Sequence, residues 1–163
     1  MTAQSAPKPA LRPYLPADAP TLAEIFRTGV ENLTGDDYDE AQQAAWIATA
    51  DDEDAFGARL AQNLTLVATL AGSPVGFASL KGPDHIDLLY VHPTAAGQGV
   101  ATALIDALER LGQARGAKRL TVDASDTARP FFERRGYTAQ RRGTLMLGGE
   151  WLGNTTMEKR LTP

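Results

Sequence analysis

Apolar and polar positions change their period along the chain, and the changes mark out a series of strands and helices. Runs typical of strands occupy 11–14, 64–70, 75–80, 85–91, 120–123, 137–147 and 151–161. Apolar residues at helical spacing occupy 18–33, 40–50, 53–62, 99–114 and 127–135. Strands that alternate with helices predict an α/β domain. We place a flexible tail at 1–10 and a single domain at 11–163.

Local signals support several of these boundaries. Asp18, followed by Pro20, is typical of a helix cap, and Gly116 and Gly136 stand where two helices should end. The segment 71–74 reads Ala-Gly-Ser-Pro, which has the composition and length of a hairpin turn. We therefore expect an antiparallel pair of strands on either side of this turn.

The loop between the strand ending at Val91 and the next helix carries the clearest chemical signal. It contains Gly97-Gln98-Gly99, directly before apolar residues at helical spacing. Glycines at a helix start let backbone N–H groups approach a ligand without a Cβ in the way. Those N–H groups are unpaired and lie at the positive end of the helix dipole, so they favour an anion. The loop predicts a site for a phosphorylated ligand.

Three kinds of phosphate loop compete for this segment. A P-loop needs Gly-Lys-Ser/Thr, but Gly99 is followed by Val100 and Ala101. A dinucleotide fingerprint starting at Gly97 would have its third glycine at Thr102, although Asp123 stands about where a ribose-binding acid would follow. The P-loop is excluded, and dinucleotide binding stays open as an alternative beside the third kind, described below.

Composition excludes several classes of protein. The chain has 163 residues and a net charge of −4, which fits one globular domain and argues against a nucleic-acid-binding surface. It has no cysteine and two histidines, so neither a disulfide, a thiol nucleophile nor a histidine–cysteine metal site is expected. No apolar run approaches the length of a membrane span, and the N-terminal segment does not read as a signal peptide. We expect a cytoplasmic protein without a metal and without a membrane or nucleic-acid partner.

The third kind of loop is found in the GNAT superfamily of N-acetyltransferases, which this sequence resembles. The family pattern is Gln/Arg-x-x-Gly-x-Gly/Ala after a strand, often preceded by Val-x-Pro. Here it matches over 96–101, preceded by Val91-His92-Pro93. Ala96 replaces the usual Gln or Arg, which removes a side-chain contact and leaves the backbone contacts. The order of strands and helices over 11–161 also resembles the family order.

The resemblance implies a fold and a co-substrate. The fold is α/β (α+β), with a mixed, mostly antiparallel sheet of six to seven strands, helices on both faces, and a V-shaped splay between the two central strands. Acetyl-CoA would lie in that splay, with its pyrophosphate on the loop and its pantetheine beside the strand that ends at Val91. The residues implied in binding it are Leu89, Tyr90, Val91, Ala96, Gly97, Gln98, Gly99, Val100, Ala101, Thr102, Ser125, Phe131 and Phe132.

Acyl transfer to an amine calls for a base near the ammonium and an acid near the leaving thiolate. His85 and Asp87 are candidates for the base, because they lie two apart on one strand and should share a face with Leu89 and Val91. A histidine is suited to work near neutral pH, whereas Asp87 would need a raised pKa or would bind the substrate ammonium.

At the position of the acid that would protonate the thiolate, the sequence departs from the family pattern. The family often places a tyrosine in the helix at 127–135, but Phe132 occupies that position here, and Ser125 stands in place of an asparagine. Either the thiolate leaves unassisted, or Tyr90, Tyr137 or Ser125 supplies a proton. We expect Tyr137 to be a core aromatic and Ser125 to contact coenzyme A.

The first helices and the final hairpin should form the acceptor side. Tyr38 and Trp46 are candidates for substrate contacts, in an aromatic and acidic pocket with Phe56, Glu31, Asp36 and Asp37. The hypothesis is an acetyl-CoA-dependent N-acetyltransferase that acetylates a primary amine by direct transfer in a ternary complex, since no cysteine is available for an acyl-enzyme. The alternatives are a catalytically silent CoA-binding sensor or scaffold and a dinucleotide-binding protein. A homodimer through the final hairpin is a further expectation from the resemblance.

Overall fold

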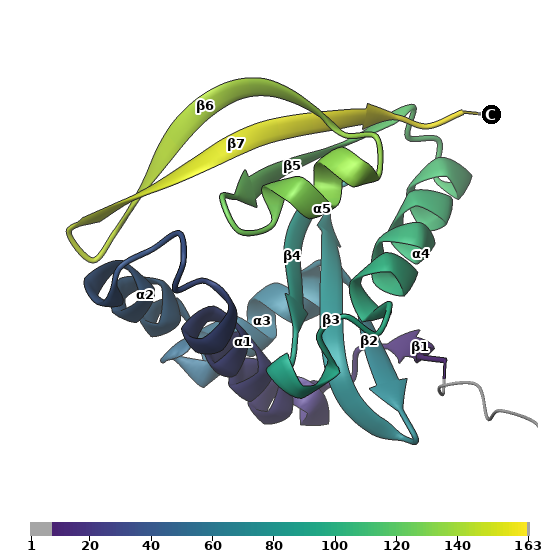
Figure 1. Cartoon of the computed structure of the whole chain (residues 1–163). Helices are drawn as coiled ribbons and strands as arrows, with labels where there is room; N and C mark the ends of the chain where they lie inside the picture. Colours follow the sequence, from purple (N-terminus) through teal and green to yellow (C-terminus); the bar gives the residue numbers. More distant parts are fainter. Residues whose placement is uncertain (1–7, 163) are drawn as a thin grey trace, which may run out of the picture.

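A computed structural model describes residues 8–162, which form a seven-stranded sheet with helices on both faces (Figure 1). The strand order is β1-β2-β3-β4-β5-β7-β6. The strands are β1 (Ala10–Pro13), β2 (Leu64–Leu70), β3 (Ser73–Lys81), β4 (His85–Val91), β5 (Arg119–Ser125), β6 (Thr138–Leu147) and β7 (Glu150–Arg160). Neighbouring strands are antiparallel except β4 and β5, which are parallel. The predicted fold class is confirmed.

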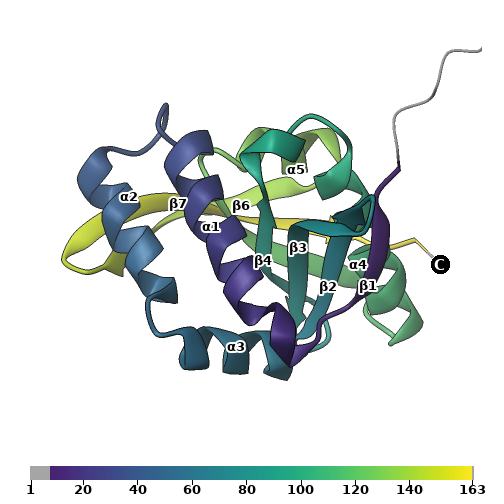
Figure 2. The ribbon, with the colours of Figure 1, turned by 90° about the horizontal axis from the view of Figure 1, so that it is seen from below.

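The helices divide between the two faces of the sheet (Figure 2). They are α1 (Ala19–Leu33), α2 (Glu40–Ile47), α3 (Glu53–Gln62), α4 (Val100–Ala114) and α5 (Arg129–Arg134). On one face α1 and α3 pack against β2, β3 and β4, around a core that includes Phe26, Phe56 and Phe77. On the other face α4 and α5 cover a core that includes Leu104 and Phe132. No helix within 8–162 is long and apolar enough to cross a membrane.

The sequence pattern located every helix and strand, with differences at the ends. Part of the tail expected at 1–10 lies outside the described residues, and β1 already begins at Ala10. Asp18 stands at the expected N-cap position of α1, but the first turn of the helix donates no hydrogen bond to its carboxylate. It accepts two hydrogen bonds of 2.8 Å from Arg12 and one of 2.9 Å from the N–H of Leu15. Asp18 therefore ties β1 to the turn that precedes the helix.

The two central strands separate soon after they begin. β4 and β5 pair only at His85 with Thr121 and at Ile86 with Val122. Beyond these pairs, β4 stays hydrogen-bonded to β3, and β5 to β7 along its whole length. Each arm of the V is therefore held by its own antiparallel partner, so the gap opens without leaving either strand unsupported. The expected splay is confirmed.

A β-bulge at Asp87 changes which face the rest of β4 presents. Ser79 and Leu80 are consecutive on β3, yet they pair with Leu88 and Ile86, so Asp87 is an extra residue in β4. After the bulge, Leu88 and Tyr90 pack in the core under α1, while Leu89 and Val91 pack in the core under α4. The expectation that Leu89 and Val91 share a face with His85 and Asp87 is wrong, because a bulge shifts the alternation by one residue.

Candidate active site

The loop between β4 and α4 is shaped by two glycines with left-handed backbone. Gly97 has φ 77° and Gly99 has φ 79°, and α4 starts at the next residue. A Cβ at either position would meet no atom within 4 Å, so the space over the loop is open. The Gln98 side chain turns back to donate to the carbonyl of Thr94 at 3.1 Å. The turn is therefore lined by main chain rather than filled by side chains.

The backbone amides of this loop are free to bind a ligand. Within the described part of the chain, the N–H groups from Gly97 to Thr102 have no hydrogen-bond acceptor, and the first N–H bonded at the start of α4 is that of Ala103, to Gly99 at 3.0 Å. Such an arrangement at a helix start suits the pyrophosphate of coenzyme A. Close packing fixes its position: a Cβ on Gly76 of β3 would lie 2.8 Å from a methyl group of Val100. The residues present fit the predicted diphosphate site.

The splay between β4 and β5 holds a mostly apolar groove of about 170 Å³. Its walls come from α1, α2, β4, β5, α5 and the turn before α5. They include the predicted residues Leu89, Tyr90, Val91, Ser125 and Phe132. Phe132 is fully buried, so it closes the groove as a wall. Ser125 accepts a hydrogen bond from the N–H of Ala128 at 3.1 Å, which holds the turn in place.

A second pocket, of about 260 Å³, lies between the splay and the β6–β7 hairpin. The two pockets meet at shared wall residues: Trp46, Ile86, Asp87, Leu88, Tyr90, Asp123 and Ser125. The second pocket adds Tyr38, Arg59 and His85, with leucines from the hairpin. A donor in the groove and an acceptor in the second pocket would therefore meet over these shared residues.

Asp87 is held in its ionised form by one neighbour on α3 and one just after that helix. Arg59 donates to both carboxylate oxygens at 2.8 and 2.9 Å, and Asn63 donates to one of them at 2.8 Å. Burial alone would raise the pKa of Asp87, but the hydrogen bonds and charge of Arg59, together with Asn63, outweigh it and lower the pKa. The raised pKa that a base at Asp87 would need is therefore not found. Arg59 was missed in the sequence because nothing local links it to β4.

His85 and Asp87, the two candidates for the base, both line the second pocket. The Nδ1 atom of His85 lies 2.8 Å from the hydroxyl of Thr121, and its Nε2 atom lies 3.8 Å from a carboxylate oxygen of Asp123. Asp123 also accepts a hydrogen bond of 2.7 Å from Thr156, and its side chain is 51% exposed. The sequence had suggested Asp123 only as a ribose ligand. In the structure it stands at the junction of the two pockets, beside His85.

Tyr90 and Trp46 form the wall nearest α1 and α2. The indole N–H of Trp46 donates to the hydroxyl of Tyr90 at 3.1 Å. Burial of that hydroxyl raises the pKa of Tyr90 to about 12, so the phenol keeps its proton at neutral pH. Tyr90 therefore stays protonated and can donate a hydrogen bond, and it is not suited to accept a proton from a substrate.

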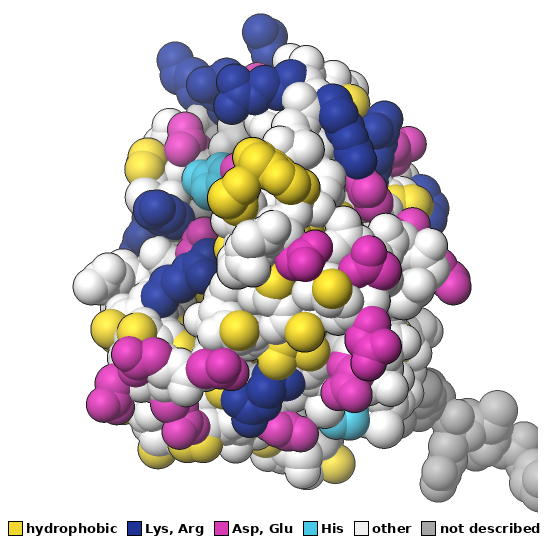
Figure 3. Space-filling view, turned by 90° about the vertical axis from the view of Figure 1, so that its left-hand side faces the viewer, with side chains coloured by type: hydrophobic (Ala, Val, Ile, Leu, Met, Phe, Trp, Pro, Cys, Tyr) yellow, Lys and Arg dark blue, Asp and Glu magenta, His cyan; other side chains and the backbone are white. Residues whose placement is uncertain are grey.

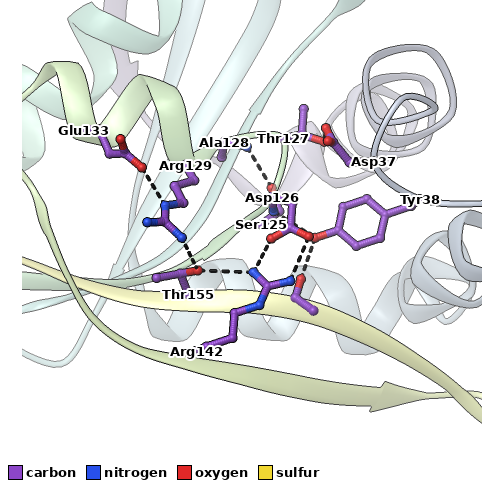
Figure 4. Close-up of polar contacts among 11 residues, drawn as sticks. Asp37, Tyr38, Ser125, Asp126, Thr127, Ala128, Arg129, Glu133, Arg142 and Thr155 are labelled. Atoms are coloured by element: carbon purple, nitrogen blue, oxygen red, sulfur yellow. Dashed lines mark hydrogen bonds and ion pairs between the residues drawn. The ribbon is translucent and has the colours of Figure 1, made fainter.

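Tyr38 is a structural link at the edge of the second pocket (Figure 4). Its hydroxyl donates to the carbonyl of Gly153 at 2.6 Å and accepts from the N–H of Asp126 at 2.9 Å. Asp126 in turn forms an ion pair with Arg142 of β6. The three residues join the turn before α2, the turn before α5 and the final hairpin, so only the ring of Tyr38 is left to contact a substrate.

Two other expectations are wrong. Phe56 is buried in the core, and Glu31, Asp36 and Asp37 do not line the second pocket, so they do not make it acidic. Glu31 lies in the last turn of α1, and Asp36 and Asp37 follow that helix. All three are exposed, and Asp37 accepts a hydrogen bond from the hydroxyl of Thr127 at 2.8 Å. The negative charge of the pocket comes instead from β4 and β5.

Tyr137 lies outside both pockets. It packs against Phe132 at 5.1 Å between ring centres, and its hydroxyl donates to Glu109 at 3.3 Å. Burial raises its pKa, as does the nearby charge of Glu109. Tyr137 is the core aromatic that the resemblance implied, and its hydroxyl is hydrogen-bonded to Glu109 on α4.

Comparisons with known proteins agree with this geometry. Residues 34–161 match the family model described as "Acetyltransferase (GNAT) domain". The chain is 35% identical over 147 residues to the uncharacterized N-acetyltransferase YafP of Escherichia coli (strain K12), covering 90% of this chain and 93% of YafP.

Solved structures show the same fold. The crystal structure of a GCN5-related N-acetyltransferase from Rhodopseudomonas palustris, described as "Aminotransferase, Class-II", has a TM-score of 0.93 and 61% identity and covers 99% of each chain. The PaiA N-acetyltransferase of Thermoplasma acidophilum, solved in complex with coenzyme A, has a TM-score of 0.78 at 18% identity, over 94% of this chain and 99% of that one. The splayed sheet, the open loop and these matches establish that the chain belongs to the GNAT family of N-acetyltransferases.

Proposed function

We propose that the protein moves an acetyl group from acetyl-CoA directly to a primary amine, with both substrates bound at once. The observation that carries this proposal is the meeting of the two pockets over residues of β4 and β5. One pocket follows β4 as far as Val91, and the other is bordered by the hairpin. Acetyl-CoA supplies an activated acyl group as a thioester. A chain without cysteine has no thiol to carry that group, which favours direct transfer.

The backbone of β4 is arranged to hold the pantetheine arm and the acyl group. The N–H of His92 bonds to Val75 of β3 at 2.7 Å. Because N–H groups alternate in direction along a strand, those of Leu89 and Val91 face the open side of the V. They would pair with amide groups of the arm as an added strand does, and one of them would polarise the acyl carbonyl. Gly97 to Thr102 would hold the diphosphate, with Ala96 and Phe131 at its margin.

We assign the base to His85. It borders the second pocket, and its ring is held by Thr121 on one side while the other nitrogen faces Asp123. Asp87 keeps the role of an ionised group that orders Arg59 and shapes the pocket. Tyr90 is the candidate acid, because it lines both pockets and keeps its proton. Phe132 has no proton to give, so thiolate departure depends on Tyr90 or proceeds unassisted.

A binding assay and an activity assay together test this function against its alternatives. Acetyl-CoA is titrated into the protein by calorimetry, and release of its thiol is then followed with a panel of primary amines. Binding with amine-dependent thiol release supports the proposal. Tight binding without turnover for any amine favours a CoA-binding sensor instead.

The dinucleotide alternative does not fit the site. Asp123 points into the second pocket beside His85 rather than toward the glycine loop. Binding of NAD to the protein in place of acetyl-CoA would restore this alternative. A cytoplasmic location and a homodimer through the hairpin stay predictions.

A further inference from the structure

The second pocket has an apolar wall that is open to solvent. Leu145 and Leu147 of β6 line it together with Leu152 of β7, and Leu145 and Leu152 are cross-strand partners. Leu145 is 48% exposed although it faces the pocket. Figure 3 shows that hydrophobic side chains gather on this side of the molecule next to a histidine, with acidic side chains below them. An apolar surface that borders a pocket marks a place for an apolar part of a ligand.

The charges in this pocket leave a single unbalanced carboxylate. Apart from His85, its walls carry the charged side chains of Arg59, Asp87 and Asp123, and one positive and two negative charges give a net charge of −1. Arg59 forms an ion pair with Asp87 and donates two hydrogen bonds to it. Among residues 8–162, the polar partners of the Asp123 carboxylate are the hydroxyl of Thr156 and, at 3.8 Å, the Nε2 atom of His85. One ammonium group beside Asp123 would balance the pocket.

A second charge on the ligand would be poorly placed. The walls also include Trp46 and the hairpin leucines, and a charged group that packs against these side chains would lose water without gaining a partner. A ligand carboxylate would also lie near two carboxylates of the protein. The pocket therefore discriminates against polyamines and amino acids as well as against small polar amines.

We propose that the acceptor is a primary amine with one positive charge and an apolar alkyl or aryl body, its ammonium on Asp123 beside His85 and its body against Trp46, Leu145 and Leu147. This inference rests on the proposed function, because it names the acceptor of the same site. Asp123 thereby becomes a specificity-determining residue that also places the amine within reach of His85.

A homologous series of amines tests the inference. Initial rates with acetyl-CoA are measured for propylamine, butylamine, pentylamine, hexylamine and phenethylamine, and for ethanolamine, putrescine, spermidine and phenylalanine. We expect kcat/KM to rise about two- to fourfold for each added methylene, as burial of apolar surface predicts. We expect the polyamines and phenylalanine to be at least about tenfold poorer than hexylamine and phenethylamine, respectively.

Two neighbouring residues of β6 provide matched variants. Leu145→Gln should flatten the dependence on chain length, because Leu145 faces the pocket. Met146→Gln should leave that dependence unchanged, because Met146 is similarly exposed, at 52%, but does not line the pocket. Asp123→Asn should lower kcat/KM for hexylamine at least about tenfold, because the ammonium loses its carboxylate partner.

The possible failures are distinguishable. Turnover that is flat along the alkyl series, or faster with spermidine or ethanolamine, overturns the inference and leaves the proposed function standing. Equal effects of Leu145→Gln and Met146→Gln also overturn it. Acetyl-CoA binding without turnover of any amine overturns the proposed function and the inference together.

Discussion

The guanidinium of Arg59 on α3 holds the carboxylate of Asp87 on β4 in a two-point contact, with Nε at 2.8 Å and Nη2 at 2.9 Å. Asp87 is the bulged residue of β4, so the contact fixes the strand at the point where it leaves β5. The contact also neutralises the positive charge of Arg59, which lines the second pocket. The pair thus connects the shape of the sheet to the charge that a substrate meets.

Arg59→Met should destabilise the protein at neutral pH by about 1–2 kcal/mol, because it leaves Asp87 ionised without its partner. The value is below that of a fully buried pair, since Arg59 is 47% exposed. The folded protein lowers the pKa of Asp87, so this contribution is present above the ordinary pKa of about 4 and is lost as the pH falls through the folded value.

Urea unfolding of both proteins at pH 7, 4 and 3 measures the effect, and the difference between them should shrink toward the lowest pH, because the folded pKa of Asp87 lies below its ordinary value. Arg27→Met is the matched control, because Arg27 pairs with Glu24 on the exposed face of α1 and should matter little. A difference that is independent of pH, or as large for Arg27→Met, would contradict the role given to the pair.

Gly99→Asp should weaken acetyl-CoA binding on the order of a hundredfold or more, because it adds a side chain and a negative charge where the diphosphate is expected. Gly72→Asp is its control: Gly72 in the β2–β3 turn has the same left-handed backbone, with φ 84°, and the same open surroundings. Both variants carry similar backbone strain, so their unfolding should be affected alike. Calorimetry with acetyl-CoA that gave near-normal affinity for Gly99→Asp would show that the diphosphate binds elsewhere.

His85→Gln should reduce kcat about a hundredfold or more, because the base that receives the ammonium proton is lost. The amide retains the size and a hydrogen bond to Thr121, so the pocket should keep its shape. The dissociation constant of acetyl-CoA, measured on the same preparation, should not change. A variant with full kcat would show that His85 is not the base and that solvent receives the ammonium proton or the amine binds already deprotonated.

Tyr90→Phe should lower kcat while it reduces the loss of stability in alkali. A tyrosine with a pKa raised to about 12 favours folding below the ordinary value near 10 and loses this contribution as the pH rises through the folded value. Because Tyr90 borders both pockets, we expect the wild type to lose about 1–2 kcal/mol more than the variant between pH 10 and 12. Urea midpoints across this range measure it, and identical slopes for the two proteins would argue against a desolvated hydroxyl.

Arg142→Gln should raise the KM for the amine several-fold without changing acetyl-CoA affinity, because the ion pair with Asp126 anchors the hairpin that carries Leu145 and Leu147. Arg142 also crosses over the Cα of Gly153, so Gly153→Ala should displace it and act in the same direction. Arg141→Gln is the control, since the described residues offer Arg141 no ion pair. Equal KM values for Arg142→Gln and Arg141→Gln would show that the hairpin does not need this anchor.

The order of elements and the glycine loop were predictable from the sequence because both depend on neighbouring residues. The periods of strands and helices, and the glycines needed for an open backbone at Gly97 and Gly99, can be recognised within a few adjacent positions of the sequence. The splay was predicted only from the family resemblance. The residues of β4 and β5 do not by themselves indicate how far along their length the two strands pair.

The chemistry of the second pocket could not be predicted in the same way. The bulge at Asp87 reverses the faces of Leu89 and Val91, and a period-2 rule cannot register an inserted residue. Arg59 lies 28 positions from Asp87 along the chain, and His85 lies far from Asp123, so only the fold brings them together. Asp36 and Asp37 were predicted to line the pocket because they are close to Tyr38 in the sequence. The acidic residues that do line it, Asp87 and Asp123, are on β4 and β5.

Steady-state rates over a grid of acetyl-CoA and hexylamine concentrations test the central claim most directly, with the acetylated amine identified by mass spectrometry. Direct transfer between two pockets that meet at Asp123 and Tyr90 predicts saturation in both substrates and double-reciprocal lines that intersect. Parallel lines, or no acetylated product at saturating acetyl-CoA, would contradict it.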